Sequence, residues 1–404
     1  MIRRLFVRLH RWTGLLMTGF LVVVGLTGAM LAYKIEIDRQ INPQLFAKPK
    51  PGAKRLDLAT LAERAEEIVA QARVAYFFDG VPDQVSLRCV PRSNPATGKP
   101  YELDFDHIFL NPWTGEELGR RREFDISRLS RINLIPFIYQ LHTSLTLGNL
   151  GSLVLGYVAL VWTLDCFVGF YLTLPAGSEH FWRKWRLAWL VKLRAGAFRI
   201  NFDLHRAGGL WTWPLLFVFA WSGVMFNLSP VYEIATGTAF DYQSAEDFIK
   251  SHPDRPIANP KLDWRAAQTR GEQLMAQQAA LHRFSIQRPA GLAYIEAWGA
   301  YSYTVQSSRD FRRRSPGTNL LLDGDSGELR DFSLPSGEHT GNTISNWLWA
   351  LHYGDVYGLR SYRAFVCVLG VLIVMLSVTG AYVWWMKRRA RHRAAVRRRS
   401  HVDA

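Results

Sequence analysis

The stretch LHRWTGLL, residues 9–16, opens a long apolar run, and LHRAGGLW, residues 204–211, opens another. Both stretches read Leu-His-Arg and reach Gly-Leu after the same spacing, so His10 corresponds to His205. A histidine that stands twice at the start of an apolar run indicates a repeated membrane segment.

Four apolar stretches have the length of a membrane-spanning helix, although the chain as a whole is only 49% hydrophobic. They are residues 15–33, 150–174, 210–228 and 365–385. Each is close to the ~20 residues that cross the ~30 Å hydrocarbon layer as a helix. The first is longer than the ~7–15-residue apolar region of a signal peptide, and no small-residue cleavage site follows it. We therefore expect it to be retained as a span.

The net charge of +15 is concentrated in three short segments beside the apolar stretches. Lys and Arg number four in residues 1–11, six in 180–199 and eight in 387–400. With four spans these segments lie on one side, and basic short loops face the cytoplasm. Both termini are then cytoplasmic, and the large loops 36–140 and 229–350 face outward. Basic clusters that directly adjoin spans favour this topology over nucleic-acid binding.

A second pair of segments also repeats: YQLHTSLTLG at 139–148 and WALHYGDVYG at 349–358. Here His142 corresponds to His352, and another apolar span follows each segment. The chain therefore reads as span, outer loop, histidine segment and span, and then the same unit again. The sequence holds only three cysteines, with no Cys-x-x-Cys-His for covalent haem attachment and no disulfide framework.

The two outer loops resemble each other as well. Residues 58–75 and 262–281 have helical periodicity, and each is followed by alternating strand-like runs, at 101–110 and 301–307. The turns NPWTGEEL and DGDSGEL then supply glycine where a tight turn needs a positive φ. We expect two small α+β modules that pack on each other, because neither is large enough to be independent.

A duplicated α-β-β module inserted between spans, with LHRWTG opening the first span, resembles the PepSY-associated transmembrane family over essentially the whole chain. Within that family the likeness is to the inner-membrane di-haem ferrisiderophore (ferrioxamine) reductase type. The expected fold is a four-helix transmembrane bundle with internal duplication and PepSY-like modules in two outer loops. The segments are span 1 (1–35), outer module 1 (36–135), histidine segment and span 2 (136–175), cytoplasmic connection (176–204), span 3 (205–228), outer module 2 (229–345), histidine segment and span 4 (346–386), and basic tail (387–404).

The predicted topology sorts the four repeated histidines into two pairs. His10 and His205 lie at the cytoplasmic edge, and His142 and His352 lie at the outer edge. A six-coordinate haem b needs two neutral imidazoles on opposite faces of its ring, and two helices related by a pseudo-dyad can present them. The resemblance implies two haem b groups, one for each pair. The alternative for any one of these histidines is an ordinary polar residue at a helix end.

Haem propionates are anionic, and guanidinium groups match carboxylate geometry. The candidate partners are Arg11 and Arg206 at the inner side, and Arg131, Arg360 and Arg363 at the outer side. All of them could instead serve only as determinants of topology.

Asp165 lies inside the second span, where an ionisable group is costly and functional by default. It could accept a proton, hold the ring of a ligand histidine, pair with a polar group of the third span, or serve packing alone. The seven remaining histidines are weaker candidates: His107, His180, His252, His282, His339, His392 and His401. His107 could suggest a metal site with Asp106, but neighbouring residues of a strand point to opposite faces, so we expect the two side chains to diverge.

The resemblance implies an inner-membrane ferric-siderophore reductase that carries electrons across the membrane and releases iron outside. A hydroxamate siderophore is the expected partner, together with membrane lipid and no nucleic acid. The donor would be a quinol or a separate cytoplasmic reductase, because no Gly-x-Gly-x-x-Gly follows a strand. Two alternatives remain open: a transporter of siderophore or iron without redox work, and a PepSY-type peptide-binding sensor.

Overall fold

The computed structural model describes residues 1–123, 129–177, 179–251 and 255–400. They form two compact units, each built from both halves of the sequence. The bundle unit comprises Met1–Ala32, Tyr139–Tyr232 and the chain from Arg363 onward, and the sheet unit comprises Tyr33–Ile138 and Glu233–Tyr362.

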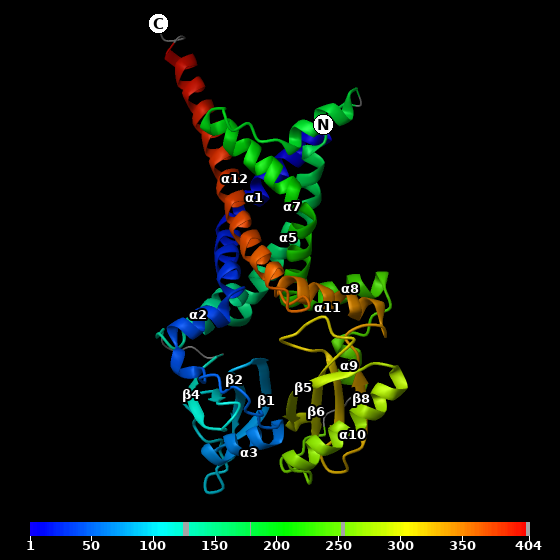
Figure 1. The fold of residues 1–404 in the computed structure, drawn as a ribbon. Helices are drawn as coiled ribbons and strands as arrows, with labels where there is room; N and C mark the ends of the chain where they lie inside the picture. Colours follow the sequence, from blue (N-terminus) through cyan, green and yellow to red (C-terminus); the bar gives the residue numbers. More distant parts are fainter. Residues whose placement is uncertain (124–128, 178, 252–254, 401–404) are drawn as a thin grey trace. The chain divides into compact units, whose positions relative to one another are not determined.

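Four long helices make up most of the bundle unit (Figure 1). They are α1 (Ile2–Leu31), α5 (Gly148–Thr173), α7 (Ala197–Asn227) and α12 (Arg360–Ser400). Within the described ranges, these are the four helices that are long and apolar enough to cross a membrane. The four spans predicted from the sequence are therefore confirmed as helices of spanning length.

The helices are longer than the apolar stretches that predicted them. α1 already begins at Ile2, so His10 lies within the helix and not before it, and α12 continues through the basic tail. Lys and Arg are good helix formers, and they keep the helix intact where it leaves the apolar stretch. Hydropathy marks where a helix is apolar, and it does not mark where the helix ends.

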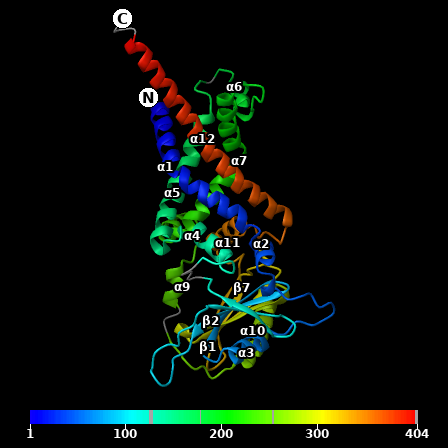
Figure 2. The same ribbon diagram turned by 90° about the vertical axis from the view of Figure 1, so that its left-hand side faces the viewer.

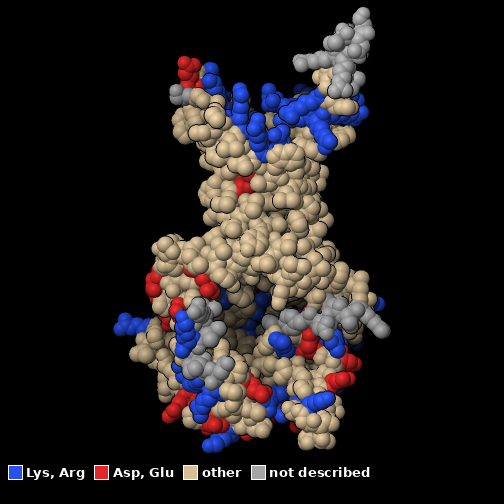
Figure 3. Space-filling model, turned by 180° about the vertical axis from the view of Figure 1, so that it is seen from behind, with Lys and Arg blue, Asp and Glu red and all other residues tan. Residues whose placement is uncertain are grey.

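The three basic segments lie at one end of the bundle unit, as predicted. Arg3 donates hydrogen bonds to the carbonyls of Leu172 and Leu174, at 2.9 and 3.0 Å, which joins the start of α1 to the end of α5. The ammonium of Lys387 in α12 lies 5.5 Å from the centre of the Phe202 ring in α7. Figure 3 shows Lys and Arg gathered at this end, next to a largely uncharged middle.

Small residues let the helices approach one another closely. A Cβ built on Gly25 of α1 would lie 2.8 Å from the carbonyl oxygen of Gly370 in α12. Likewise, a Cβ on Gly223 of α7 would lie 3.0 Å from the Cβ of Ala159 in α5. A compact apolar core closes the centre of the bundle, with Met17, Leu21, Cys166, Leu216, Leu369 and Ile373 buried in it.

The sheet unit holds two modules, each with one helix and a four-stranded antiparallel sheet in simple sequential order (Figures 1 and 2). The first contains α3 (Leu58–Ile68), β1 (Ala72–Val81), β2 (Gln84–Pro91), β3 (His107–Leu110) and β4 (Glu117–Arg121). The second contains α10 (Trp264–His282), β5 (Ile286–Ile295), β6 (Ala300–Ser307), β7 (Thr318–Asp323) and β8 (Leu329–Ser333).

Shorter helices connect these parts. They are α2 (Lys34–Ile41), α4 (Leu134–Ser144), α6 (Phe181–Arg186), α8 (Ser229–Ala239), α9 (Ala245–Ser251) and α11 (Thr340–His352), with 3-10 turns at Pro43–Leu45, Leu187–Trp189 and Glu296–Trp298.

The two modules make the same local contacts. Asp57 caps α3 by accepting a hydrogen bond from the Thr60 N–H at 2.8 Å, and Asp263 caps α10 through the Ala266 N–H at 2.7 Å. Caps of this kind satisfy a backbone N–H that the first helical turn leaves unpaired. In both modules a turn glycine of positive φ, Gly115 or Gly327, packs against an arginine of the capped helix.

One hydrophobic core runs through both modules, which confirms the expectation that they pack together. α3 lies beside α10 (Figure 2), and β1 lies beside β5 (Figure 1). Trp264 of the second module is buried against Phe77 of the first, with ring centres 6.4 Å apart. The side chain of Gln268 accepts a hydrogen bond from the Ala59 N–H at 2.8 Å.

Two expectations about the modules were incomplete. The helix predicted over 58–75 ends at Ile68, and the chain from Ala72 forms β1, because the aromatic and β-branched residues there pair with β2. Each sheet also has four strands, two more than the α-β-β pattern implies. The two additional strands of each sheet supply hydrogen-bond partners for backbone N–H and C=O groups of their neighbouring strands.

Candidate cofactor site in the helical bundle

His10 of α1 and His205 of α7 meet inside the bundle unit, although 194 residues separate them in the chain. Their ring centres are 6.0 Å apart, and the ring planes are inclined by 54°. Both rings are half-buried. The two LHR motifs therefore bring their histidines to one place, as the repeat predicts.

Each ring is held through its Nδ1 nitrogen. Nδ1 of His10 lies 3.0 and 2.9 Å from the two carboxylate oxygens of Asp165 in α5. Nδ1 of His205 donates to the carbonyl oxygen of Leu376 in α12 at 2.9 Å. Both acceptors require the proton on Nδ1, so each neutral ring keeps its lone pair on Nε2. Among the described residues, no hydrogen bond reaches Nε2 of either ring.

Glycines of neighbouring helices lie against both rings. A Cβ built on Gly169 of α5 would be 3.5 Å from Cε1 of His10, and one on Gly380 of α12 would be 2.9 Å from Cε1 of His205. Any larger residue at position 380 would press on the ring. Gly14 and Gly209, which stand one turn after the histidines, contact neither ring.

The arginines that follow the two histidines each bury a polar atom that lacks a partner. Nε of Arg11 and Nε of Arg206 are both buried without a hydrogen bond. The terminal nitrogen of Arg206 is already bonded to Asp203 at 2.9 Å and to the Leu187 carbonyl at 2.7 Å. Arg11 makes no ion pair with any described carboxylate, and its guanidinium carbon lies 5.8 Å from the Trp12 ring centre.

These features fit the haem that the family resemblance implies. A metal–imidazole bond is about 2 Å long, so two imidazoles on opposite sides of one metal would have ring centres about 6 Å apart. The observed separation of 6.0 Å agrees with that. Metal-bound histidines also hold their second ring nitrogen on a carboxylate or a backbone carbonyl, as His10 and His205 do here. The buried Nε of Arg11 remains available for an anionic group.

The outer pair is divided between the two units. His142, in α4, belongs to the bundle unit, where its Nδ1 lies 3.0 Å from the hydroxyl oxygen of Thr27. That hydroxyl donates to the Val23 carbonyl at 2.7 Å, so it accepts from His142. A Cβ on Gly28 would lie 3.0 Å from Cε1 of the same ring. His352 ends α11 in the sheet unit, and the pairing of His142 with His352 stays a prediction.

The other candidate arginines occupy different settings. Nε of Arg131 donates to the Ile41 carbonyl at 2.7 Å, within the sheet unit. Arg360 is exposed at the start of α12, and Arg363 is half-buried one turn later. Their role towards an outer haem stays a prediction.

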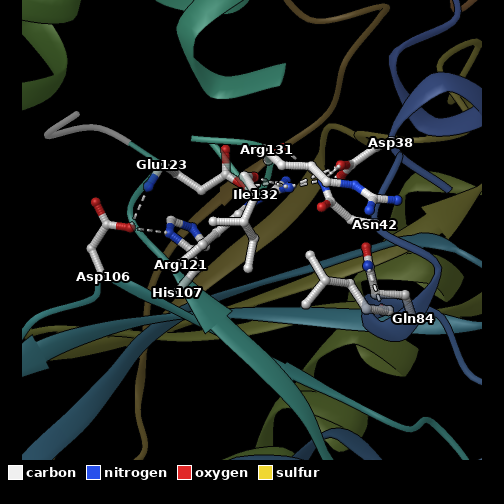
Figure 4. A network of polar contacts seen from close by, with 10 residues as sticks. Asp38, Asn42, Gln84, Asp106, His107, Arg121, Glu123, Arg131 and Ile132 are labelled. Atoms are coloured by element: carbon white, nitrogen blue, oxygen red, sulfur yellow. Dashed lines mark hydrogen bonds and ion pairs between the residues drawn. The ribbon is translucent and has the colours of Figure 1, made fainter. Parts of the chain in front are cut away.

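A buried polar network ties α2 to β4 in the sheet unit (Figure 4). Arg121 bonds both carboxylate oxygens of Asp38, at 3.1 and 2.8 Å, and its Nε donates to Glu123 at 2.6 Å. Nearby, Nδ1 of His107 lies 2.9 Å from the carboxylate of Asp106. Our expectation that these two side chains diverge was wrong, because Asp106 precedes β3 and is not bound by the alternation of the strand.

In the part of the chain that the structure describes, the remaining histidines join no group of three or more His, Cys, Asp or Glu side chains that could hold a metal ion. His339 pairs with Asp241, with Nδ1 3.0 Å from the carboxylate. His252 and His401 lie outside the described residues.

Sequence reasoning missed several groups of this site. Asp165 was not one of them: holding the ring of a ligand histidine was one of its predicted roles, and its carboxylate does contact Nδ1 of His10. Gly169 and Gly380 lie in two similar segments that end the second and fourth spans, VGFY at 168–171 and TGAY at 379–382, so the repeat contained a signal for them. The Leu376 carbonyl carried no sequence signal, because a backbone acceptor is independent of the side chain.

Comparison with known families gives one match, which covers most of the chain. The family described as the PepSY-associated TM region matches residues 7–387. No curated protein matches the chain.

Proposed function

Because the chain belongs to the PepSY-associated transmembrane family, we propose that it is a di-haem b electron-transfer protein of the bacterial inner membrane. It reduces a ferric siderophore on the outer face and so releases iron. The observation that carries this proposal is the His10–His205 pair, with its rings 6.0 Å apart and both Nδ1 atoms held by acceptors.

The residues of the bundle would hold and shield the cofactor. His10 and His205 supply Nε2 lone pairs from opposite helices, and the acceptors on Nδ1 keep the rings from turning. Arg11 would pair with a propionate. The apolar core of the bundle adjoins the site, since Cys166 of that core follows Asp165 in α5. His142 and His352 would form the outer site, with Arg131, Arg360 and Arg363 as propionate partners.

Bound haem b would supply a one-electron couple at each site. The substrate is the siderophore-bound ion: reduction of Fe(III) to Fe(II) makes the metal softer and weakens its bonds to hard oxygen ligands such as hydroxamates. Electrons would come from a quinol or a cytoplasmic reductase. The gathering of Lys and Arg at one end of the bundle supports cytoplasmic termini, since basic segments stay inside.

We also propose that the two halves of the chain are copies of one ancestral unit. Several matched features support this: the LHR motifs, the Asp57 and Asp263 caps, and the Gly115 and Gly327 turns. Duplication accounts for two similar histidine pairs in one chain.

A pyridine haemochrome assay on the purified full-length protein tests the assignment of ligands. We expect two b haems per chain, and one in either His205→Ala or His352→Ala. His339→Ala, which removes a half-buried histidine of the sheet unit, is the control and should keep two. A colourless wild-type protein, or full haem content in both ligand variants, would show that the proposal is wrong.

Direction is tested separately in oriented vesicles. Reduced protein should pass electrons to an external ferric hydroxamate siderophore in right-side-out vesicles, and not in inside-out vesicles. Equal oxidation in both orientations would contradict vectorial transfer.

A further inference from the structure

Around the two inner histidines, the glycine contacts follow the repeat and the acceptors for Nδ1 do not. Gly169 lies against His10 as Gly380 lies against His205, and these glycines occupy the same place in the repeated VGFY and TGAY segments. Four residues before each glycine stand Asp165 and Leu376. Both positions supply the acceptor for a histidine Nδ1, but one uses a side-chain carboxylate and the other a backbone carbonyl.

Hydrogen bonds hold the Asp165 carboxylate in place, and no described Lys or Arg neutralises its charge. Asp165 is only 9% exposed. Its oxygens contact Nδ1 of His10, and Oδ1 also accepts a hydrogen bond from the Thr13 hydroxyl at 3.2 Å. Within the described ranges, no Lys or Arg pairs with it. Its negative charge therefore exerts an electrostatic effect on the His10 ring and on a metal bound to Nε2 of that ring.

A carboxylate on Nδ1 makes the imidazole a stronger electron donor at Nε2 than a carbonyl or a hydroxyl does. A stronger donor stabilises the more highly charged oxidised metal, and a nearby buried negative charge acts in the same direction. The partner of His142, the outer histidine of the bundle unit, carries no charge: its Nδ1 lies 3.0 Å from the hydroxyl of Thr27.

We propose that Asp165 is a positioning residue that holds His10 and keeps the His10–His205 site at a lower reduction potential than the His142 site. This inference rests on the proposed function. It identifies what makes electron transfer from the cytoplasmic to the outer site favourable.

The test is a potentiometric titration of the full-length haem protein, followed by visible absorption. The inner component is identified as the one that His205→Ala removes. In Asp165→Asn, which keeps an acceptor oxygen but loses the charge, the inner potential should rise and the outer potential should not move. We expect the equilibrium constant for inner-to-outer transfer to fall at least tenfold, which is about 59 mV for a one-electron couple.

Two further variants control for general damage to the bundle. Asp165→Glu should restore the low potential, because it returns the carboxylate. Thr163→Val removes a buried hydroxyl that, among the described residues, bonds only within α5, to the Ala159 carbonyl, and should leave both potentials unchanged. Loss of only the inner haem in Asp165→Asn, with recovery in Asp165→Glu, would also support the positioning role.

Failure of the inference is distinguishable from failure of the proposed function. Two haems with the same two potentials in wild type and Asp165→Asn would overturn the inference and leave the proposed function standing. Absence of haem from the wild-type protein would overturn both.

Discussion

Gly169 and Gly380 occupy equivalent places in the repeat, but they approach their histidine rings to different distances. A Cβ on Gly380 would stand 2.9 Å from the His205 ring, closer than van der Waals contact allows, whereas one on Gly169 would stand 3.5 Å from the His10 ring. Small residues in membrane helices commonly mark close packing. Here they lie where an imidazole ring packs against a neighbouring helix.

This difference predicts that the same substitution lowers the haem content at one glycine and has no effect at the other. Gly380→Ala should push His205 away from the Leu376 carbonyl and lower the content of the inner haem. Gly169→Ala should leave that content unchanged, because its Cβ makes an ordinary contact. Haem content and the thermal unfolding midpoint of both purified variants check this. Equal behaviour of the two variants would contradict the assignment of Gly380.

At the scale of single elements, the two capped helices of the sheet unit depend on Asp57 and Asp263. Each carboxylate accepts from the N–H three residues later, at 2.8 and 2.7 Å. Loss of such a cap costs about 1 kcal/mol.

We therefore expect Asp57→Ala and Asp263→Ala each to lower the free energy of unfolding by about 1 kcal/mol. Asp57→Asn and Asp263→Asn keep a capping oxygen and should retain most of the stability. Denaturant unfolding of each Ala and Asn pair measures the difference. No loss in either Ala variant would show that the caps are dispensable.

The strand β2 carries a thiol that the fold protects. Cys89 is buried in the core of the sheet unit, and burial raises the pKa of its thiol to about 12. The thiolate is the reactive form, so the folded protein should react very slowly at pH 8. Because the folded pKa lies above the unfolded one, this thiol contributes stability that is complete below the unfolded pKa and is lost as the pH rises towards 12.

Labelling with a maleimide tests this in the Cys166→Ser/Cys367→Ser variant, in which Cys89 is the remaining cysteine. We expect no labelling at pH 8 until denaturant is added. Rapid labelling of the folded protein would show that β2 is exposed in solution.

At the scale of the molecule, the sheet unit unites residues far apart in sequence through one core. Trp264 begins α10, yet its indole N–H donates to Glu66 of α3 at 3.3 Å and its ring packs on Phe77. A contact of this kind makes the two modules a single cooperative structure.

Removal of this contact should therefore affect both modules. We expect Trp264→Ala to cost about 3–5 kcal/mol and to reduce hydrogen-exchange protection in α3 and β1 as well as in α10. Leu281→Ala, at an exposed position of the same helix, is the matched control. Protection lost only from the second module would contradict a shared core.

The sequence by itself determined the four membrane helices, the repeated order of elements and the meeting of His10 with His205. Apolar length fixes where a helix can span, and a repeated motif at the same depth of two helices brings its residues to the same level of the bundle. The charge pattern likewise determined that the three basic segments share one end.

Only the tertiary structure decided how the rings are held. Asp165, the Leu376 carbonyl, Gly169 and Gly380 reach the histidines from other helices, and no local pattern encodes the rotation of one helix against another. The same reason explains the start of β1, because residues 72–75 were predicted as helix and instead pair with β2. Contacts between distant segments depend on packing, which becomes defined only when all the elements are assembled.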